Sequence, residues 1–290
     1  MTPTLLGQAA LNGLLFGGLY SLMAVGLSLI FGVLRVINIA HGDMMVWGSY
    51  LAFLLALRVG VDPFVSFVFS AGFLFCVGVL VQRGLVNRVL DAPHEMQILL
   101  TLGVALVMEN LALVVFGPET RRSESAYGLL TVWLGPLFVD VPRLLTFAVA
   151  LLLALALYLF LFRTDLGTVI RAAADNPYGA RVVGADVSRV YTVAFGIGAG
   201  CVGAAGALMS ALVPFSPASG FPQTVTSFNI VIIGGMGSLL GAFLGGILVA
   251  VAESLGAVLL APSLKELVSF VLLVLILLFR PQGLLGGRAP

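Results

Sequence analysis

The chain has 290 residues, of which 60% are hydrophobic and 9% charged, and its formal net charge is +1. With a mean hydropathy of +1.16, this composition excludes an ordinary soluble domain, which could not cover its surface with so few charges. The net charge also argues against a nucleic-acid partner. Since a spanning helix needs roughly 20 apolar residues, we predict one all-α polytopic membrane domain over residues 1–290, with about eight to nine spans.

The first predicted span, residues 9–31, carries Gly13 and Gly17, a small-xxx-small pair that allows another helix backbone to approach closely. A polar interruption at residues 36–43 follows it, and the apolar segment 44–57 is short for a full span. A broken or re-entrant helix is therefore predicted here. The other simple spans are apolar stretches separated by polar segments, at residues 64–81, 96–116, 144–162, 191–212 and 264–279.

Residues 164–189, here called the charged loop, concentrate charges in a chain that otherwise has few. Thr164 is a candidate N-cap for one short helix, and Asn176 followed by Pro177 marks the start of a second, over residues 178–183. Gly184 stands where a left-handed C-terminal stop belongs. The pattern predicts two short capped helices between two spans, suited to being held by a partner outside the bilayer. An ordinary solvated loop is the alternative.

Residues 225–257 are too long for one span and too rich in glycine at 234–238 for a continuous helix. The motifs Phe16-Gly17 and Phe195-Gly196 match, as do the regions around Asn38 and Asn229. These pairs suggest an inverted repeat in which paired broken helices frame a pathway near the membrane midplane. Chance similarity between glycine-rich segments is the alternative.

The distribution of arginine predicts the orientation, because cytoplasmic loops are enriched in Lys and Arg. It places the N-terminus outside and the charged loop inside. The arginines predicted to lie inside are Arg35, Arg83, Arg88, Arg163, Arg171, Arg181, Arg189, Arg280 and Arg288; those predicted to lie outside are Arg58, Arg121, Arg122 and Arg143.

Motifs for catalysis or metal binding are weak. Lys265 is the only lysine and follows no glycine-rich loop, so ATP hydrolysis by a P-loop is not predicted. Glu109 and Glu253 lie in apolar runs, where an ionised group costs about 2.5 kcal/mol or more, so each is either a structural group or part of a pathway. His41 is interpreted as a partner for exposed backbone, with no metal role. Cys76 and Cys201 are predicted to be buried small hydrophobes.

Three segments resemble the branched-chain amino-acid ABC importer permeases, most closely the H-type (Liv) subunit. They are residues 33–43, the run Arg171-Ala172-Ala173-Ala174-Asp175-Asn176-Pro177 with Arg181 and Gly184, and Gly234-Gly235-Met236-Gly237-Ser238 before Gly241. The resemblance implies that the charged loop is a cytoplasmic coupling loop that docks on an ATPase. Arg171 precedes the alanines where other importer classes have a Glu-Ala-Ala pattern, so the details of the docking are expected to differ between classes.

The resemblance further implies a multi-pass protein of the bacterial inner membrane, with an M-type second permease, two ATPase subunits and a periplasmic substrate-binding protein as partners. This chain would carry no cofactor, since ATP and Mg²⁺ would bind the ATPase subunits. The residues expected to couple to the ATPase are Arg171, Asp175, Asn176, Pro177, Tyr178, Arg181 and Gly184. Those expected along the translocation pathway are Asn38, His41, Gly42, Glu109, Asn229, Gly235 and Gly237.

Two alternatives stay open at this stage. An autonomous secondary transporter or channel would couple to protons through Glu109 or Glu253 and would not need an ATPase. A member of the same family could instead carry urea or short amides. An intramembrane enzyme is disfavoured because no nucleophile–base pair or metal-ligand cluster stands out in the sequence.

Overall fold

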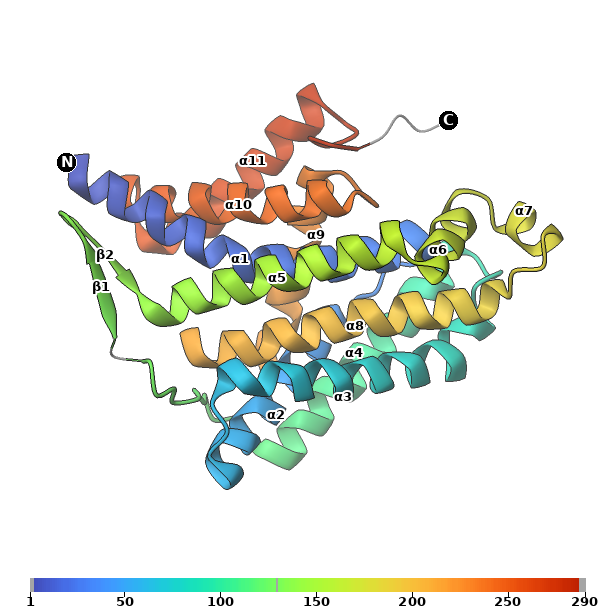
Figure 1. The fold of residues 1–290 in the computed structure, drawn as a ribbon, viewed down its shortest axis with the longest axis horizontal. Coiled ribbons are helices and arrows are strands. Elements are labelled where there is room, and N and C mark those ends of the chain that lie inside the picture. The colour runs from blue at the N-terminus through green and yellow to red at the C-terminus, as the bar shows by residue number, and fades with distance from the viewer. Residues whose placement is uncertain (1–2, 129, 287–290) are drawn as a thin grey trace.

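Figure 1 shows the computed structural model, which describes residues 3–128 and 130–286 as long helices lying side by side. The α-helices are α1 Pro3–Leu34, α2 His41–Val59, α3 Pro63–Gly84, α4 His94–Phe116, α5 Val141–Arg163, α6 Asp165–Asp175, α7 Pro177–Val182, α8 Val187–Leu212, α9 Gly220–Gly234, α10 Leu239–Leu259 and α11 Lys265–Phe279. Eight helical segments in the described part are long and apolar enough to cross a membrane. The predicted polytopic helical fold is confirmed.

Helices α1 and α8 form the centre, and glycines allow their neighbours to approach closely. Gly26 of α1 meets Gly198 of α8, and Gly48 of α2 meets Gly203 of α8. A side chain at any of these positions would collide with backbone atoms, which explains the many glycines in these apolar helices. The predicted close approach at Gly13 and Gly17 is likewise confirmed, because both lie against the backbone of α10.

An inverted arrangement relates the two ends of the chain. α1 and α8 run in opposite directions along the bundle (Figure 1), and each is followed by a break and then by a helix, α2 or α9. α3 packs mainly along α8, whereas α10 packs mainly along α1. Phe16 lies 25 residues before the start of α2 at His41, and Phe195 lies 25 residues before the start of α9 at Gly220. The Phe-Gly match therefore falls at corresponding places in the arrangement.

The predicted match between the regions around Asn38 and Asn229 is wrong, because the two residues occupy different positions relative to their helices. Asn38 lies before α2, whereas Asn229 lies inside α9. Likewise, the glycine interruption after α9 exists but is a turn between α9 and α10, with Gly234 packed against Gly241 and Gly237 against Gly32 near the end of α1. A glycine-rich stretch indicates that the helix stops, but it does not indicate at what membrane depth.

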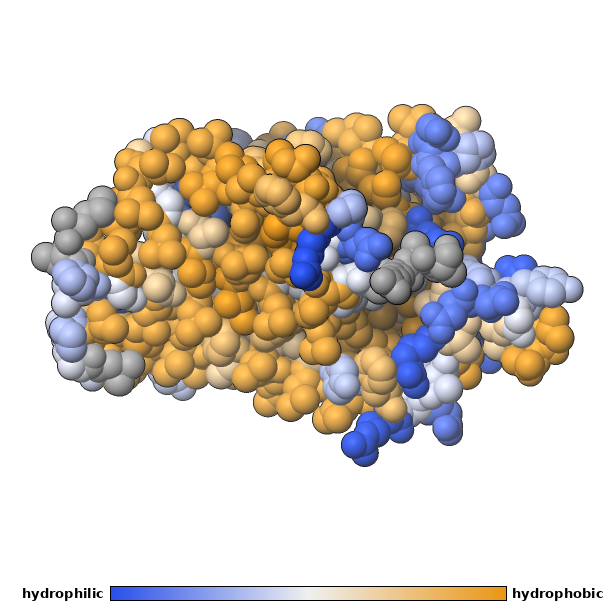
Figure 2. Space-filling model, turned by 90° about the horizontal axis from the view of Figure 1, so that it is seen from above, coloured by the Kyte–Doolittle hydropathy of each residue, from blue (hydrophilic) through white to orange (hydrophobic). Residues whose placement is uncertain are grey.

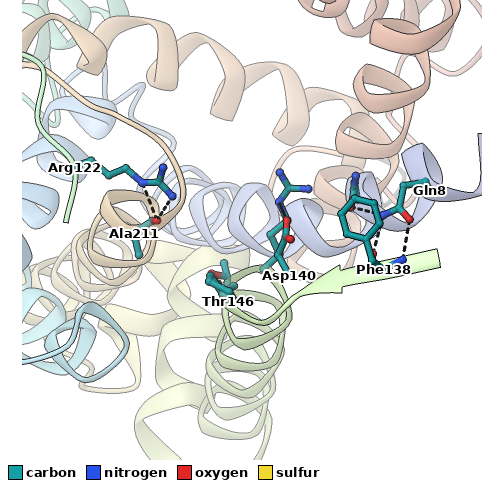
Figure 3. A network of polar contacts seen from close by, with 9 residues as sticks. Gln8, Arg122, Phe138, Asp140, Thr146 and Ala211 are labelled. Carbon is teal, nitrogen blue, oxygen red and sulfur yellow. Dashed lines mark hydrogen bonds and ion pairs between the residues drawn. The ribbon is translucent and has the colours of Figure 1, made fainter. Parts of the chain in front are cut away.

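The segment between α4 and α5 contains two strands that the sequence did not predict, β1 Thr131–Leu134 and β2 Leu137–Asp140, paired antiparallel. The side chain of Gln8 from α1 both donates to the Phe138 carbonyl and accepts from the Phe138 N–H, which holds the hairpin over the N-terminal end of α1 (Figure 3). The guanidinium of Arg122 donates twice to the Ala211 carbonyl at the end of α8. This segment therefore ties the N-terminal end of α1 to the C-terminal end of α8.

Within the described residues there are also three short 3-10 helices, η1 Val86–Arg88, η2 Pro217–Ser219 and η3 Pro262–Leu264. η1 follows α3, η2 fills the break before α9, and η3 leads into α11. The cysteine prediction is wrong for Cys76, which is exposed on α3, while Cys201 is partly buried, and neither forms a disulfide. Apolar helices of a membrane bundle direct side chains outward as well as inward, so an apolar run does not imply burial in the protein.

Candidate functional site

The charged loop folds into the two capped helices that its sequence predicts. Thr164 Oγ1 accepts from Gly167 N–H at 3.1 Å and caps α6, and Asn176 Oδ1 accepts from Gly179 N–H at 2.9 Å and caps α7. Gly184 has a φ of 90°, a left-handed conformation that few other residues adopt easily. Asp186 then caps α8 through Arg189 N–H at 3.0 Å. Each helix boundary in this loop is therefore set by a capping side chain or a glycine only a few residues away.

α7 projects beyond the ends of the other helices, at the right of Figure 1. Its outer surface, here called the α7 tip, consists of Tyr178, Val182 and Val183, which are 76%, 70% and 83% exposed. In Figure 2 an apolar patch stands at this end of the molecule beyond a band of hydrophilic residues. Apolar side chains gathered outside the membrane-spanning part are typical of a protein-binding surface.

The remaining coupling candidates surround the α7 tip without forming one cluster. Asp175 and Asn176 are exposed at the α6–α7 junction, and Arg181 is exposed on α7. Arg171 instead folds back onto α5, with its guanidinium carbon 4.6 Å from the centre of the Phe162 ring. The loop therefore presents an apolar tip, while Arg171 belongs to the junction with the membrane-spanning helices.

The pathway candidates Asn38, His41 and Gly42 lie where α2 and α9 cross. Gly42 N–H donates to Thr224 Oγ1 at 2.8 Å, and Thr224 Oγ1 donates to the Ile39 carbonyl at 2.9 Å. His41 Nε2 lies 3.0 Å from the Met23 carbonyl of α1, in agreement with its predicted role as a backbone partner. The amide of Asn38 instead donates to the Met44 sulfur. Thr224, which sequence analysis missed, is the side chain that joins the two helices.

The N-termini of α2 and α9 meet at this crossing, and a carboxylate of the protein itself lies between them. Asp43 lies in the first turn of α2, and its carboxylate packs against Gly220, the first residue of α9. A carboxylate there favours both helices, because the N-terminal end of a helix carries a partial positive charge. Glu109 of α4 is near enough for its charge to interact with that of Asp43. The crossing is therefore a structural joint of tightly packed, mostly buried groups.

The other pathway candidates do not converge on this joint. Asn229 is buried within α9, and its Oδ1 has no partner among the described residues. Gly235 and Gly237 lie in the α9–α10 turn with φ of 105° and 83°. Gly235 packs against Gly286 of the C-terminal segment, and Gly237 against Gly32. Of the seven pathway candidates, three therefore lie at the α2–α9 joint and two in the α9–α10 turn, while Glu109 and Asn229 stand apart.

Replacing Thr224 by Val tests the joint. The substitution keeps the shape but leaves the Gly42 N–H and the Ile39 carbonyl without their partner, at a cost of about 1–3 kcal/mol. We expect a lower apparent Tm in detergent, measured by loss of the monodisperse peak after heating. Thr226→Val is the matched control, because Thr226 Oγ1 donates only to Pro222 within α9. Equal losses for both variants would contradict the assigned role of Thr224.

The two ends of the bundle differ in their positive charge. The described arginines on the side of α6 and α7 lie at or next to the ends of the long helices, or on the two short helices. They are Arg35, Arg83, Arg88, Arg163, Arg171, Arg181, Arg189 and Arg280. Those on the side of the β-hairpin are Arg58, Arg121, Arg122 and Arg143. Arg288 lies outside the described residues. The positive-inside rule therefore predicts that the α6–α7 end faces the cytoplasm.

Comparison with known proteins agrees with this arrangement. Residues 9–277 match the model of a family described as branched-chain amino acid transport system / permease component. The chain is 29% identical to the high-affinity branched-chain amino acid transport system permease protein BraD of Pseudomonas aeruginosa, over 96% of this chain and 95% of the relative. The LivH permease protein of Escherichia coli K12 is also 29% identical, with the same two coverages.

The LivM permease protein of Escherichia coli K12 is 29% identical over 94% of this chain but only 69% of its own length. No solved structure matches the fold. The family model covers nearly all of the chain, and its match extends from α1 to α11. This multi-pass membrane protein therefore belongs to the family of branched-chain amino acid transport system permease components, and it aligns over nearly its full length with H-type members.

Proposed function

We propose that the chain is the membrane-spanning permease subunit of an ATP-driven ABC importer in a bacterial inner membrane. It carries branched-chain or related amino acids that a periplasmic binding protein delivers. An M-type second permease completes the membrane part, and two ATPase subunits bind ATP and Mg²⁺, so this chain needs no cofactor. Permease relatives of both the LivH and LivM types support a two-permease assembly.

The observation that carries the proposal is the α7 tip. Three exposed apolar side chains stand at the arginine-rich end, on a helix capped at its start by Asn176 and followed by Gly184 in its left-handed conformation. An ATPase groove would bury them, and burial of apolar surface would supply the binding free energy. Coupling is then mechanical. A moving ATPase displaces α7, and the short α6–α7 connection transmits the displacement to α5 and α8.

The energy source tests this proposal directly. The chain is reconstituted with its partner subunits and binding protein in vesicles, and leucine uptake is measured with ATP and with a proton gradient separately. We expect uptake that requires ATP and survives a protonophore. Uptake by the chain alone that collapses with the proton gradient would support the secondary-transporter alternative instead.

Glu253→Gln separates the two mechanisms at the level of one residue. Glu253 is buried on α10, and Tyr20 of α1 donates a hydrogen bond to its Oε2 at 2.9 Å. A glutamine preserves an acceptor for Tyr20 but cannot exchange a proton. We therefore expect transport within about twofold of the parent, since a retained hydrogen bond leaves the helix contact intact. Loss of uptake with normal insertion and thermal stability would indicate a proton-carrying carboxyl group.

A further inference from the structure

An apolar groove lies on the outer surface of the bundle between α5 and α10. Both helices pack along α1 (Figure 1), and Val25 of α1 lies at the floor of the groove, whose volume is about 350 Å³. Among the side chains that line it, Leu151, Leu155 and Leu240 are 47%, 54% and 57% exposed. Since both walls are membrane-spanning helices, these side chains face either lipid or another protein.

The groove leads, at the α6–α7 end of the bundle, into a cavity that carries charge. This cavity has a volume of about 650 Å³ and shares Tyr158, Leu239 and Leu240 with the groove. Tyrosine is enriched at the interface between the membrane and water, so Tyr158 marks the level at which the apolar part ends. The charged side chains of the cavity are Arg35, Arg171 and Asp175. An occupant of both spaces therefore needs an apolar chain joined to a charged group.

The two arginines of the cavity have few partners within the protein. Neither Arg35 nor Arg171 forms a salt bridge with a described residue. Arg171 donates one hydrogen bond, to Thr168 Oγ1 at 3.4 Å, while its Nε is buried without a partner in the described part of the chain. The Phe162 ring, 4.6 Å from the guanidinium carbon, holds this side chain against α5. Guanidinium groups fixed on a cavity wall and not paired to a carboxylate favour an anionic ligand.

Two backbone features add to the positive character of the cavity. Among the described residues, Arg35 is the only one other than glycine with a positive φ, 56°. Strained backbone of this kind is concentrated where a side chain has to be held for a ligand. In addition, α10 starts at Leu239 on the cavity wall, and the N-terminal end of a helix carries a partial positive charge that favours phosphate groups.

We propose that the groove and the cavity together bind one anionic glycerophospholipid of the cytoplasmic leaflet, of the phosphatidylglycerol type. Arg35 and Arg171 face its phosphodiester group, and one acyl chain lies in the groove over Val25. The hydroxyl groups of the head group donate hydrogen bonds to Asp175. Clustered basic groups at the cytoplasmic ends of membrane-spanning helices are suited to anionic head groups.

The charge balance decides between the classes of phospholipid. Two arginines and Asp175 leave one positive charge without compensation, which a single phosphodiester neutralises. A zwitterionic phospholipid would bring an ammonium group as well and leave the positive charge in place. The bound head group also connects the segment after α1, which carries Arg35, to α6, which carries Arg171. This site goes beyond the proposed function, since it depends on neither the transported substrate nor the ATPase.

Photo-crosslinking from the groove tests the lipid site in the complete transporter. A photoreactive amino acid is placed at Leu155, and the transporter is reconstituted in vesicles of equal parts phosphatidylglycerol and phosphatidylethanolamine with identical acyl chains. After illumination, the masses of the lipid adducts give the ratio of the two lipids at that position. The matched position is Leu80 of α3, which is 70% exposed and lines neither the groove nor the cavity. We expect the ratio of phosphatidylglycerol to phosphatidylethanolamine to be about fivefold higher at Leu155 than at Leu80, as charge-assisted contacts allow.

Substitutions at the charged end separate a specific site from general lipid contact. Arg35→Gln combined with Arg171→Gln should lower the ratio at Leu155 to that at Leu80. Arg163→Gln should leave it unchanged, because Arg163 is exposed at the end of α5 and does not line the cavity. The ratio at Leu155 with both arginines intact is decisive by itself if the double variant does not fold.

Three outcomes would overturn the lipid site. Equal ratios at Leu155 and Leu80, or enrichment of phosphatidylethanolamine, would remove the preference for an anionic lipid. Adducts of Leu155 with a partner protein in place of lipid would assign the groove to a protein interface. Loss of the enrichment in excess glycerol phosphate would assign the cavity to a free phosphate ester. Each of these results would leave ATP-driven uptake, and with it the proposed function, intact.

Discussion

Replacing Tyr178 and Val182 together by Asp is expected to abolish ATP-driven uptake while the protein still inserts and folds. Both side chains are on the α7 tip and contribute little to the internal core, since they are 76% and 70% exposed. Charged groups cannot be buried in an apolar groove without a large desolvation cost. An anchor residue of an interface is worth about 2 kcal/mol or more, so the pair should weaken ATPase binding by well over about tenfold.

Co-purification of the ATPase subunits and the rate of leucine uptake provide the two readouts. Leu166→Asp is the matched control, because it also replaces an exposed apolar side chain by an acidic one, in the first turn of α6 away from the α7 tip. The control should keep both the complex and the uptake. A double variant that retains full uptake would remove the α7 tip from the coupling mechanism.

The second large effect is expected from Gly42→Val, which acts on folding stability and not on coupling to the ATPase. A Cβ at Gly42 would overlap the Gly220 carbonyl and the Thr224 side chain at the crossing of α2 and α9. Overpacking of this kind costs about 1–3 kcal/mol or more. The apparent Tm in detergent should therefore fall by about 5–10 °C, and the yield of monodisperse protein should drop.

Gly72→Val supplies the control for that experiment. Gly72 is in α3, where an added Cβ would meet nothing within 4 Å. The change in helix propensity is comparable, so the difference between the two variants isolates the effect of the close contact. If both variants were equally stable, the α2–α9 joint would not be the tight structural element described here.

The parts that sequence predicted well are those whose causes are local. A cap depends on a side chain and an N–H group only a few residues away, so Thr164, Asn176 and Gly184 each indicate a helix boundary by themselves. The interruption before α2 was equally visible, because a polar run between apolar segments ends a helix in a membrane. These local signals located the charged loop and the broken helix correctly.

The parts that failed depend on distant contacts. Thr224 joins α9 to Ile39 and Gly42, more than 180 residues earlier, and nothing near Thr224 in sequence marks that role. Asn229 and Gly235 looked like pathway residues because their motif resembles the region around Asn38, but they occupy different places in α9 and its turn. The hairpin did have a signal, Gly135 followed by Pro136 between its strands, with Gly135 at a φ of 63°.

The cavity beside α6 could not be predicted from the sequence for the same reason. Ser28, Arg35 and Arg171 come from α1, the segment after it, and α6, and only the packing of α5, α6 and the α9–α10 turn makes them neighbours. Arg171 was assigned to ATPase docking because of its place in the charged loop. Its contact with Phe162 turns it toward the membrane-spanning helices instead.

Photo-crosslinking from Val183 tests the central claim, that the α7 tip holds the motor. Val183 is 83% exposed, and a photoreactive amino acid there should trap an ATPase subunit in intact cells in high yield. The matched position is Val59, which is 67% exposed at the opposite end of the bundle and should give no ATPase adduct. Adducts with an ATPase subunit from Val183 alone are the expected result. An ATPase adduct from Val59, or adducts of Val183 with periplasmic proteins only, would contradict the account.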